Sequence, residues 1–179
     1  MRIDAPDNSL GPYLTNKALD SIEIHFKTGI PVGSIRKMRS GETKAIPGGE
    51  LYLISLIAKD EIEIVLQKVY PNLKLVKTDK LLHNNVKADT SEVGKMLFSL
   101  EEYNLDILAY RTGIKRDRLL RLTKLSPDKI QSHELYLIEL GSNQQSGTLF
   151  RRLFKNLQLN SPEEEAKLRS EEKVRNSKK

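Results

Sequence analysis

Two clusters of arginine and lysine side chains are the residues of this chain best suited to bind a ligand. One cluster contains Arg36 and Lys37, and the other contains Arg116 and Arg121. An arginine fork can donate two hydrogen bonds to guanine O6 and N7, and cationic side chains in general attract phosphates. The residue types therefore favour nucleic acid as the ligand, while solvated surface remains the alternative for each single residue.

Residues for catalysis or metal binding do not occur at useful spacings. The three histidines show no metal-ligand spacing, and His133 precedes a buried segment as a possible helix cap. Paired carboxylates such as Glu101 and Glu102 are adjacent and point apart. The chain has no cysteine, no phosphate-cradling glycine loop and no nucleophile motif. We therefore expect no metal, no cofactor and no enzymatic activity.

The elements that must position the basic clusters occur twice. The first copy has Thr28-Gly29-Ile30 and then Glu50–Ile54, and the second has Thr112-Gly113-Ile114 and then Glu134–Ile138, offset by 84 residues. The same ungapped offset relates 72–75 to 156–159. Such a register indicates an internal duplication in which each copy is one structural unit.

The duplication predicts two small domains in this chain of 179 residues. They span 8–75 and 91–159, with a linker at 76–90 and a charged tail at 160–179. The net charge is +6, but residues 1–70 are neutral and 91–160 carry +3. This balance permits phosphate binding without demanding it. The tail begins with a capping box at 161–164, and its composition predicts either a solvated helix or disorder, with disorder favoured beyond about Ser170.

The hydrophobic periodicity predicts an all-α fold with five helices in each copy. Asp20 or Ser21 should cap the second helix at its start, Gly29 should end it in a left-handed conformation, and Asp60 is the expected cap of the fifth. The predicted helices are 10–18, 21–27, 31–40, 50–58 and 61–70, and then 91–103, 105–111, 115–124, 132–140 and 146–156. No apolar run reaches membrane-spanning length and no signal peptide begins the chain, so we expect a cytoplasmic protein without a membrane partner.

A short helix, a tight turn and a second helix follow one another in each copy. In the second copy Gly113 allows the turn, and Ile114, Leu119 and Leu122 should fix the second helix on the core. The opposite side of that helix is then free to enter a major groove. This order of elements is the physical pattern of a helix-turn-helix.

At these residues the sequence resembles the lambda-repressor-like, or xenobiotic-response-element, family of DNA-binding domains. The resemblance rests on 24–41 in the first copy, with its closing Gly41, and on 108–122 in the second. It implies two tandem five-helix domains and a bacterial or phage-type transcriptional regulator, repressor-like, that binds specific double-stranded DNA. Two residues depart from the family pattern: His25 replaces a small residue, and Leu125 replaces the second closing glycine.

The residues expected to contact DNA lie on the outer sides of the two second helices. Arg36 and Arg121 are the best candidates for guanine contacts, whereas Arg39, Lys44, Lys115 and Arg118 are candidates for phosphate contacts. The full set of expected contact residues is Val32, Gly33, Ser34, Arg36, Lys37, Arg39, Ser40, Lys44, Lys115, Arg116, Asp117, Arg118, Leu120, Arg121 and Lys124.

Leu120 leaves an alternative function open. On the outer side of its helix it could meet a thymine methyl, or it could indicate that the second copy binds a protein. The second hypothesis is therefore an adaptor or nucleic-acid-binding subunit of a larger complex, which uses one or both copies for protein contacts. If both copies read DNA, they should contact major-groove faces about one helical turn apart. A second copy of the chain is a further possible partner.

Overall fold

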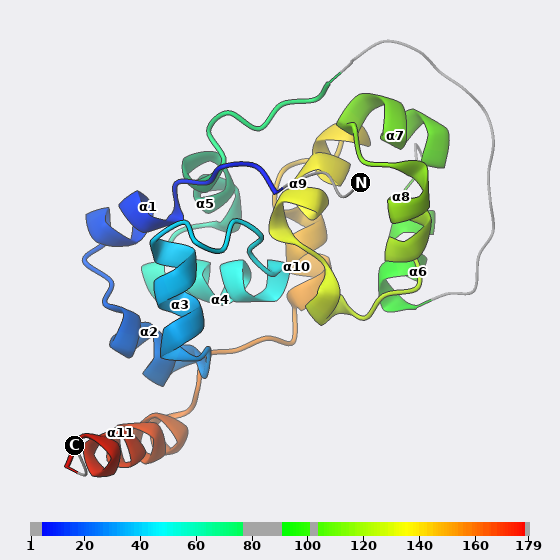
Figure 1. Cartoon of the computed structure of the whole chain (residues 1–179). Helices are drawn as coiled ribbons and strands as arrows, with labels where there is room; N and C mark the ends of the chain where they lie inside the picture. The colour runs from blue at the N-terminus through cyan, green and yellow to red at the C-terminus, as the bar shows by residue number, and fades with distance from the viewer. Residues whose placement is uncertain (1–4, 77–90, 101–103, 178–179) are drawn as a thin grey trace.

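The computed structural model describes residues 5–76, 91–100 and 104–177, and this part of the chain is all-α, as predicted (Figure 1). The described residues contain no β-strand, only an isolated antiparallel bridge between Pro47 and Gln131. None of the helices in the described ranges has the length and apolar character needed to cross a membrane.

Among the described residues, each repeat contains five α-helices, and an eleventh follows them. The first repeat contains α1 (Leu10–Asn16), α2 (Ser21–Thr28), α3 (Val32–Arg39), α4 (Gly48–Ala58) and α5 (Ile62–Val69). The second contains α6 (Glu92–Phe98), α7 (Leu105–Thr112), α8 (Arg116–Leu122), a 3-10 turn η1 (Pro127–Lys129), α9 (Ser132–Gly141) and α10 (Thr148–Phe154). The last helix is α11 (Pro162–Ser177).

Several helix ends differ from the predictions for tertiary reasons. Asp60 does not cap α5, whose N-cap is Glu61, because its carboxylate accepts hydrogen bonds from the Tyr13 hydroxyl at 3.0 Å and from Lys17 Nζ at 2.6 Å. His133 lies within α9 and is buried, so it is no cap either. The helix predicted at 91–103 is shorter than expected: α6 ends at Phe98 and has the same length as α1. The last part of that prediction, 101–103, lies outside the described residues.

The two repeats are joined by hydrogen bonds that are reciprocal. The Gly48 N–H donates to the Ile130 carbonyl and the Ser132 N–H donates to the Ile46 carbonyl, both at 2.8 Å. Under the 84-residue offset, Ile46 is equivalent to Ile130, and Gly48 to Ser132. Each bond is therefore the counterpart of the other, with the donor and acceptor repeats exchanged. Such an exchange is the mark of a local twofold axis, which passes by the Pro47–Gln131 bridge.

A second reciprocal pair of hydrogen bonds joins the end of each repeat to the other repeat. The segment after α5 reaches α7, where the Val76 N–H donates to the Arg111 carbonyl at 2.7 Å. The segment after α10 reaches α2, where the Asn160 N–H donates to the Lys27 carbonyl at 2.7 Å. Each repeat therefore completes the other, as the subunits of a dimer do when they exchange arms.

The hydrophobic core is continuous across the twofold axis. Buried residues of both repeats form one cluster that includes Ile54, Val69, Leu135 and Phe150. At the contact the Tyr70 hydroxyl lies 2.6 Å from Ser132 Oγ. The equivalent position across the axis pairs Phe154 with Gly48, where a methyl group would approach the Phe154 ring to 3.0 Å. An aromatic ring therefore packs against the other repeat on both sides of the axis, although only the Tyr70 side has a hydroxyl that can form a hydrogen bond.

The C-terminal helix α11 breaks this symmetry because it packs against α2 of the first repeat (Figure 1). Arg169 donates to both carboxylate oxygens of Glu23 at 2.9 and 2.8 Å, and its guanidinium lies 4.3 Å from the centre of the Phe26 ring. The helix continues to Ser177, so the disorder predicted beyond Ser170 was wrong. The first half of α11 is held by these contacts, which composition alone does not reveal.

Candidate nucleic-acid interface

The repeated Thr-Gly-Ile segment forms the turn between two helices in each repeat. In the first repeat Thr28 Oγ1 donates to the Ile24 carbonyl at 2.6 Å and accepts from the Ile30 N–H at 3.2 Å. Thr112 does the same with Leu108 and Ile114. Gly29 and Gly113 both have a φ of 74°, a left-handed conformation that glycine adopts at little cost. The threonine hydroxyl and the left-handed glycine therefore form the turn through local contacts in both repeats.

The helix after the turn is fixed by its apolar side. Ile35 and Met38 of α3 are buried, as are Leu119 and Leu122 of α8, all as predicted. Burying a side chain of this size contributes about 1.5–3 kcal/mol, so each helix is anchored by a few kcal/mol. Its outer side is left to solvent.

Two glycines that the sequence analysis overlooked bring α3 and α8 close to the first helix of each repeat. A methyl group on Gly11 of α1 would lie 2.2 Å from the Arg39 carbonyl oxygen, and one on Gly94 of α6 would lie 2.3 Å from that of Thr123. No side chain fits at either position. The two glycines are 83 residues apart, one fewer than the repeat offset, so the ungapped comparison did not align them.

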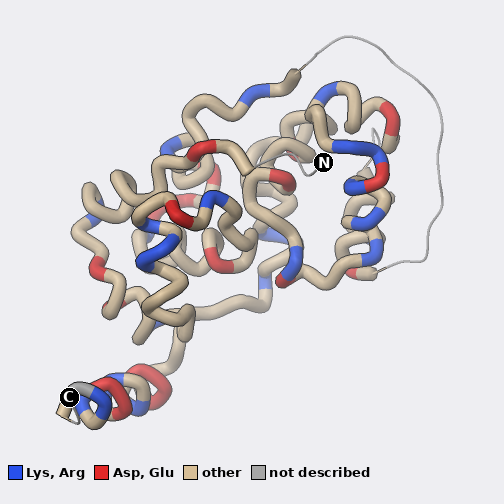
Figure 2. Tube along the Cα trace, in the orientation of Figure 1, with Lys and Arg blue, Asp and Glu red and all other residues tan. Residues whose placement is uncertain are grey.

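Lysine and arginine residues occur along α3 and α8 (Figure 2), and most of their side chains are exposed. Within the described residues, no acidic side chain pairs with Arg36, Lys115 or Lys124. Arg121 is exposed and makes only a 3.4 Å hydrogen bond to the carbonyl of Asp117 in its own helix. These cations are available to bind an anion.

Other expected contact residues take part in internal ion pairs or hydrogen bonds. Arg118 donates to both carboxylate oxygens of Glu134 at 2.6 and 2.8 Å, and this partner raises the pKa of the arginine. Arg39 donates to the Leu19 carbonyl at 2.9 Å, and so joins the end of α3 to the loop after α1. Both side chains are half-buried and position their helices. Their expected role as phosphate contacts competes with these internal bonds.

The remaining charged candidates make weaker pairs at the surface. Arg116 donates to Asp106 at 2.9 Å, Lys37 lies 3.2 Å from Glu42, and Lys44 lies 2.6 Å from Asp7. Exposed ion pairs of this kind contribute at most about 1 kcal/mol and exchange readily with other anions. Phosphate groups can therefore displace these carboxylates.

The uncharged candidates divide by exposure. Gly33, Ser34 and Ser40 are exposed, as is Asp117, and Val32 is half-buried. Leu120 is not on the free surface as expected, because its side chain packs against the core. Under the repeat offset it is equivalent to Arg36, whereas Arg121 is equivalent to Lys37.

The two repeats hold their second helices differently. Glu50 is the equivalent of Glu134, and Ser34 occupies the position of Arg118. No cation faces Glu50 in the described structure, and burial raises the pKa of its carboxyl. The first repeat instead uses Arg39, whose equivalent is Thr123. α8 is thus anchored near its start and α3 near its end.

His25 closes the first turn. Its Nδ1 lies 2.8 Å from the Ile30 carbonyl oxygen, and its ring is tilted against Phe26.

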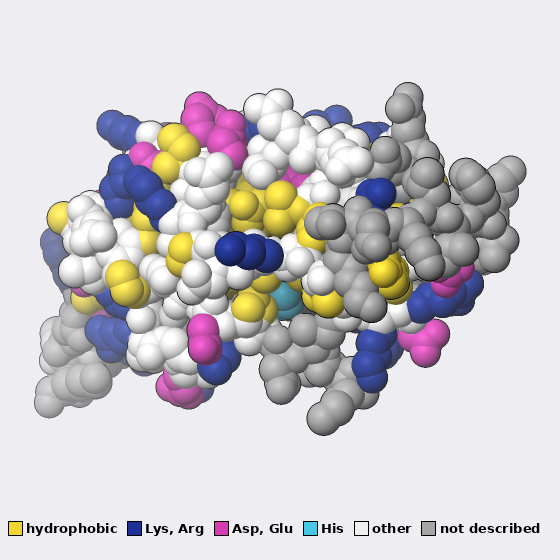
Figure 3. Space-filling view, turned by 90° about the horizontal axis from the view of Figure 1, so that it is seen from above, with side chains coloured by type: hydrophobic (Ala, Val, Ile, Leu, Met, Phe, Trp, Pro, Cys, Tyr) yellow, Lys and Arg dark blue, Asp and Glu magenta, His cyan; other side chains and the backbone are white. Residues whose placement is uncertain are grey.

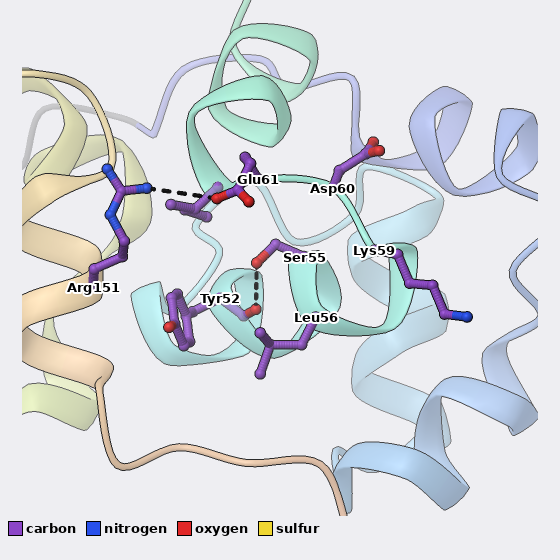
Figure 4. A pocket seen from close by; sticks show the side chains of 8 residues that line it. Tyr52, Ser55, Leu56, Lys59, Asp60, Glu61 and Arg151 are labelled. Carbon is purple, nitrogen blue, oxygen red and sulfur yellow. Dashed lines mark hydrogen bonds and ion pairs between the residues drawn. The ribbon is translucent and has the colours of Figure 1, made fainter.

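Metal-ligating side chains and surface hollows are the other features of the described residues that could bind a ligand. The described residues contain no cluster of histidine, aspartate and glutamate that could hold a metal ion. An open hollow of about 250 Å³ lies between α4 and α10 and is lined in part by Tyr52, Leu56 and Arg151 (Figure 4). Arg151 reaches across it toward Glu61 at 3.9 Å, while Asp60 and Lys59 point away. These groups do not converge on a common point.

Basic side chains are spread over more of the surface than α3 and α8. Seen from above, they are scattered across the face, and hydrophobic side chains gather near its middle (Figure 3). Both repeats therefore carry basic residues, although the net positive charge lies mainly in the second.

Comparisons of the chain with protein-family models, with curated proteins and with solved structures find no match.

Proposed function

We propose that this chain is a sequence-specific, double-stranded DNA-binding transcriptional regulator, repressor-like, with a helix-turn-helix in each repeat. The observation that carries the proposal is the pair of fixed helices, α3 and α8, whose outer sides bear unpaired cations. A major groove admits one α-helix, and cations on that helix and its flanks bind bases and phosphates. The frame around each helix is rigid because its other side is buried.

Individual side chains have different parts in this proposal. Lys37 and Arg121 occupy equivalent positions, with Arg36 next to the first of them, and these three side chains are the proposed base readers. Lys115 and Lys124 are the proposed phosphate contacts of the second repeat. Arg39 and Arg118 position the helices and need not touch DNA.

A second candidate function has one specific observation in its favour. Lys37, Arg39 and Lys44 of the first repeat all have internal partners, so Arg36 is its one unpaired cation on or beside α3 within the described residues. The first repeat then serves as a protein-binding module, and only the second repeat binds DNA. The same set of variants separates these two functions.

The test is a gel-shift titration against a pool of random duplexes at several salt concentrations. Each phosphate contact contributes about 0.9 to the slope of log affinity against log salt concentration. We expect Lys115→Glu with Arg121→Glu, and separately Arg36→Glu with Lys37→Glu, to weaken binding at least about tenfold and to reduce the slope. Lys59→Glu with Lys74→Glu is the control, since both lysines are exposed and belong to neither α3 nor α8.

The outcomes discriminate between the readings. Loss with both double variants supports two DNA-binding repeats, whereas loss with the α8 variant alone supports the second candidate. An affinity for duplex that is the same in all variants, or that does not change with salt, refutes DNA binding through these helices.

A further inference from the structure

The local twofold axis fixes how α3 and α8 are related. Two elements exchanged by a twofold rotation lie at the same height along the axis, and where they cross it at right angles they run antiparallel to each other. Figure 1 shows the consequence: α3 and α8 stand on either side of the molecule, one running up and the other down. The reciprocal bonds at Gly48 and Ser132 hold this relation, because neither repeat can turn without breaking them.

The two outer surfaces related by the axis are chemically different. Under the repeat offset, Val32 corresponds to Arg116 and Ser40 to Lys124. The largest difference is at Arg36, an exposed cation whose equivalent, Leu120, is partly buried. Two helices with such different side chains do not select the same bases.

One end of the molecule is marked by α11. The helix is held by Glu23, which accepts both hydrogen bonds from Arg169, and by Lys27, which lies 3.4 Å from Glu165. The equivalent of Glu23 in the second repeat is Ile107, a buried apolar residue that offers no acceptor. α11 therefore has a binding surface on the first repeat and none of the same kind on the second.

We infer that one chain binds one duplex as a complete twofold unit, on an inverted pair of two unlike half-sites, in a single orientation. This inference rests on the proposed DNA-binding function. α3 reads one half-site and α8 the other, and α11 lies on the flank of the half-site read by α3. A symmetric dimer on a palindrome has two equivalent orientations, whereas this chain has one, so binding gives the site a direction.

The geometry disfavours a direct repeat. Helices that run in opposite directions meet the major groove in the same way only when the two half-sites are also inverted. Reading a direct repeat requires one helix-turn-helix to turn around, against the bonds at Gly48 and Ser132. We expect inversion of one half-site, which converts the selected site to a direct repeat, to weaken binding at least tenfold.

The experiment starts from the full chain and a random duplex library. Bound duplexes are selected and sequenced, and native mass spectrometry gives the number of chains on each duplex. We expect two unlike half-sites in inverted orientation and one chain per duplex. Two chains per duplex, a perfect palindrome, a direct repeat or a single half-site overturns the inference. Recovery of no sequence at all instead counts against the proposed function.

Orientation is measured with a cleavage reagent attached to a single cysteine. The natural chain has no cysteine, so Glu42→Cys and Ser126→Cys each provide one attachment point, at equivalent exposed positions after α3 and α8. We expect a reagent on residue 42 to cut near one half-site and a reagent on residue 126 to cut near the other. Cutting by each reagent near both half-sites shows two orientations and refutes the directional part.

Discussion

Arg118 of the second repeat corresponds to Ser34 of the first, so Arg118→Ser gives both repeats a serine at this position. The change breaks two charge-assisted hydrogen bonds, of 2.6 and 2.8 Å, to a carboxylate whose side chain is only 10% exposed. Such bonds contribute about 1.5–3 kcal/mol each when buried. Because the Arg118 side chain is itself 30% exposed, solvent screens the pair, and we expect a total loss of about 2–3 kcal/mol.

The reverse change supplies the missing partner in the first repeat. Ser34→Arg places a guanidinium where Arg118 stands in the second repeat, facing the carboxylate of Glu50. Burial raises the pKa of Glu50 in the folded state, so the wild-type chain loses stability as the pH rises through that pKa. The arginine stabilises the charged form, and its benefit should therefore be absent at pH 4 and fully present at pH 7. We expect a gain of about 1 kcal/mol at neutral pH.

Urea unfolding at pH 4 and at pH 7 measures both effects. Ser34→Gln is the matched control, since it changes the same position without adding a charge. In a separate thermal unfolding experiment, the loss of stability in Arg118→Ser should lower the melting temperature of a chain of this size by about 5–10 °C. If Arg118→Ser costs less than about 0.5 kcal/mol, or if Ser34→Arg shows no advantage over Ser34→Gln that grows with pH, the assignment of equivalent ion-pair positions is refuted.

Three further predictions test other parts of the structure. Gly94→Ala should destabilise the fold by at least about 2 kcal/mol and weaken duplex binding, because α8 must move to make room for the methyl group. Gly33→Ala should be neutral or stabilising, since nothing lies within 4 Å of the added methyl group. Equal unfolding curves for the two variants would contradict the close approach of α6 and α8. Burial raises the pKa of Glu139 to about 7. Its contribution to stability is therefore present below the unfolded pKa of 4.5 and is lost as the pH rises through about 7. Glu139→Gln should abolish this pH dependence of stability, and a pH profile identical to wild type would contradict the prediction. Arg169→Ala should release α11 and raise hydrogen exchange in it without changing exchange in α8; unchanged protection of α11 would show that Glu23 does not hold the helix.

The part of the fold that the sequence predicted well is governed by local bonds. Thr28, Gly29 and Ile30 form their turn through bonds that span four residues or fewer, and Asp20 caps α2 through a bond to Ile22. Contacts this short are encoded in neighbouring residues, so periodicity and turn chemistry suffice to predict them. The buried sides of α3 and α8 were predictable for the same reason.

The candidate interface was only partly predictable. A helical pattern shows which side of α8 faces outward, but it does not show that Glu134, sixteen residues later, takes the guanidinium of Arg118. In the same way, the pattern placed Leu120 outside, although the tertiary packing draws it onto the core. The ends of long side chains are positioned by neighbours that the linear sequence does not identify.

By itself, the sequence determined that the chain is a duplication of a helical unit with two similar helix pairs and two different outer surfaces. Only the tertiary structure decided that the copies interlock. The exchange of partners at Ile46 and Ile130, and again at Val76 and Asn160, depends on groups more than thirty residues apart in the chain. Backbone donors and acceptors are the same in every residue, so the sequence does not indicate which distant pairs will meet. The twofold axis arises because two nearly identical surfaces satisfy each other best when they are exchanged.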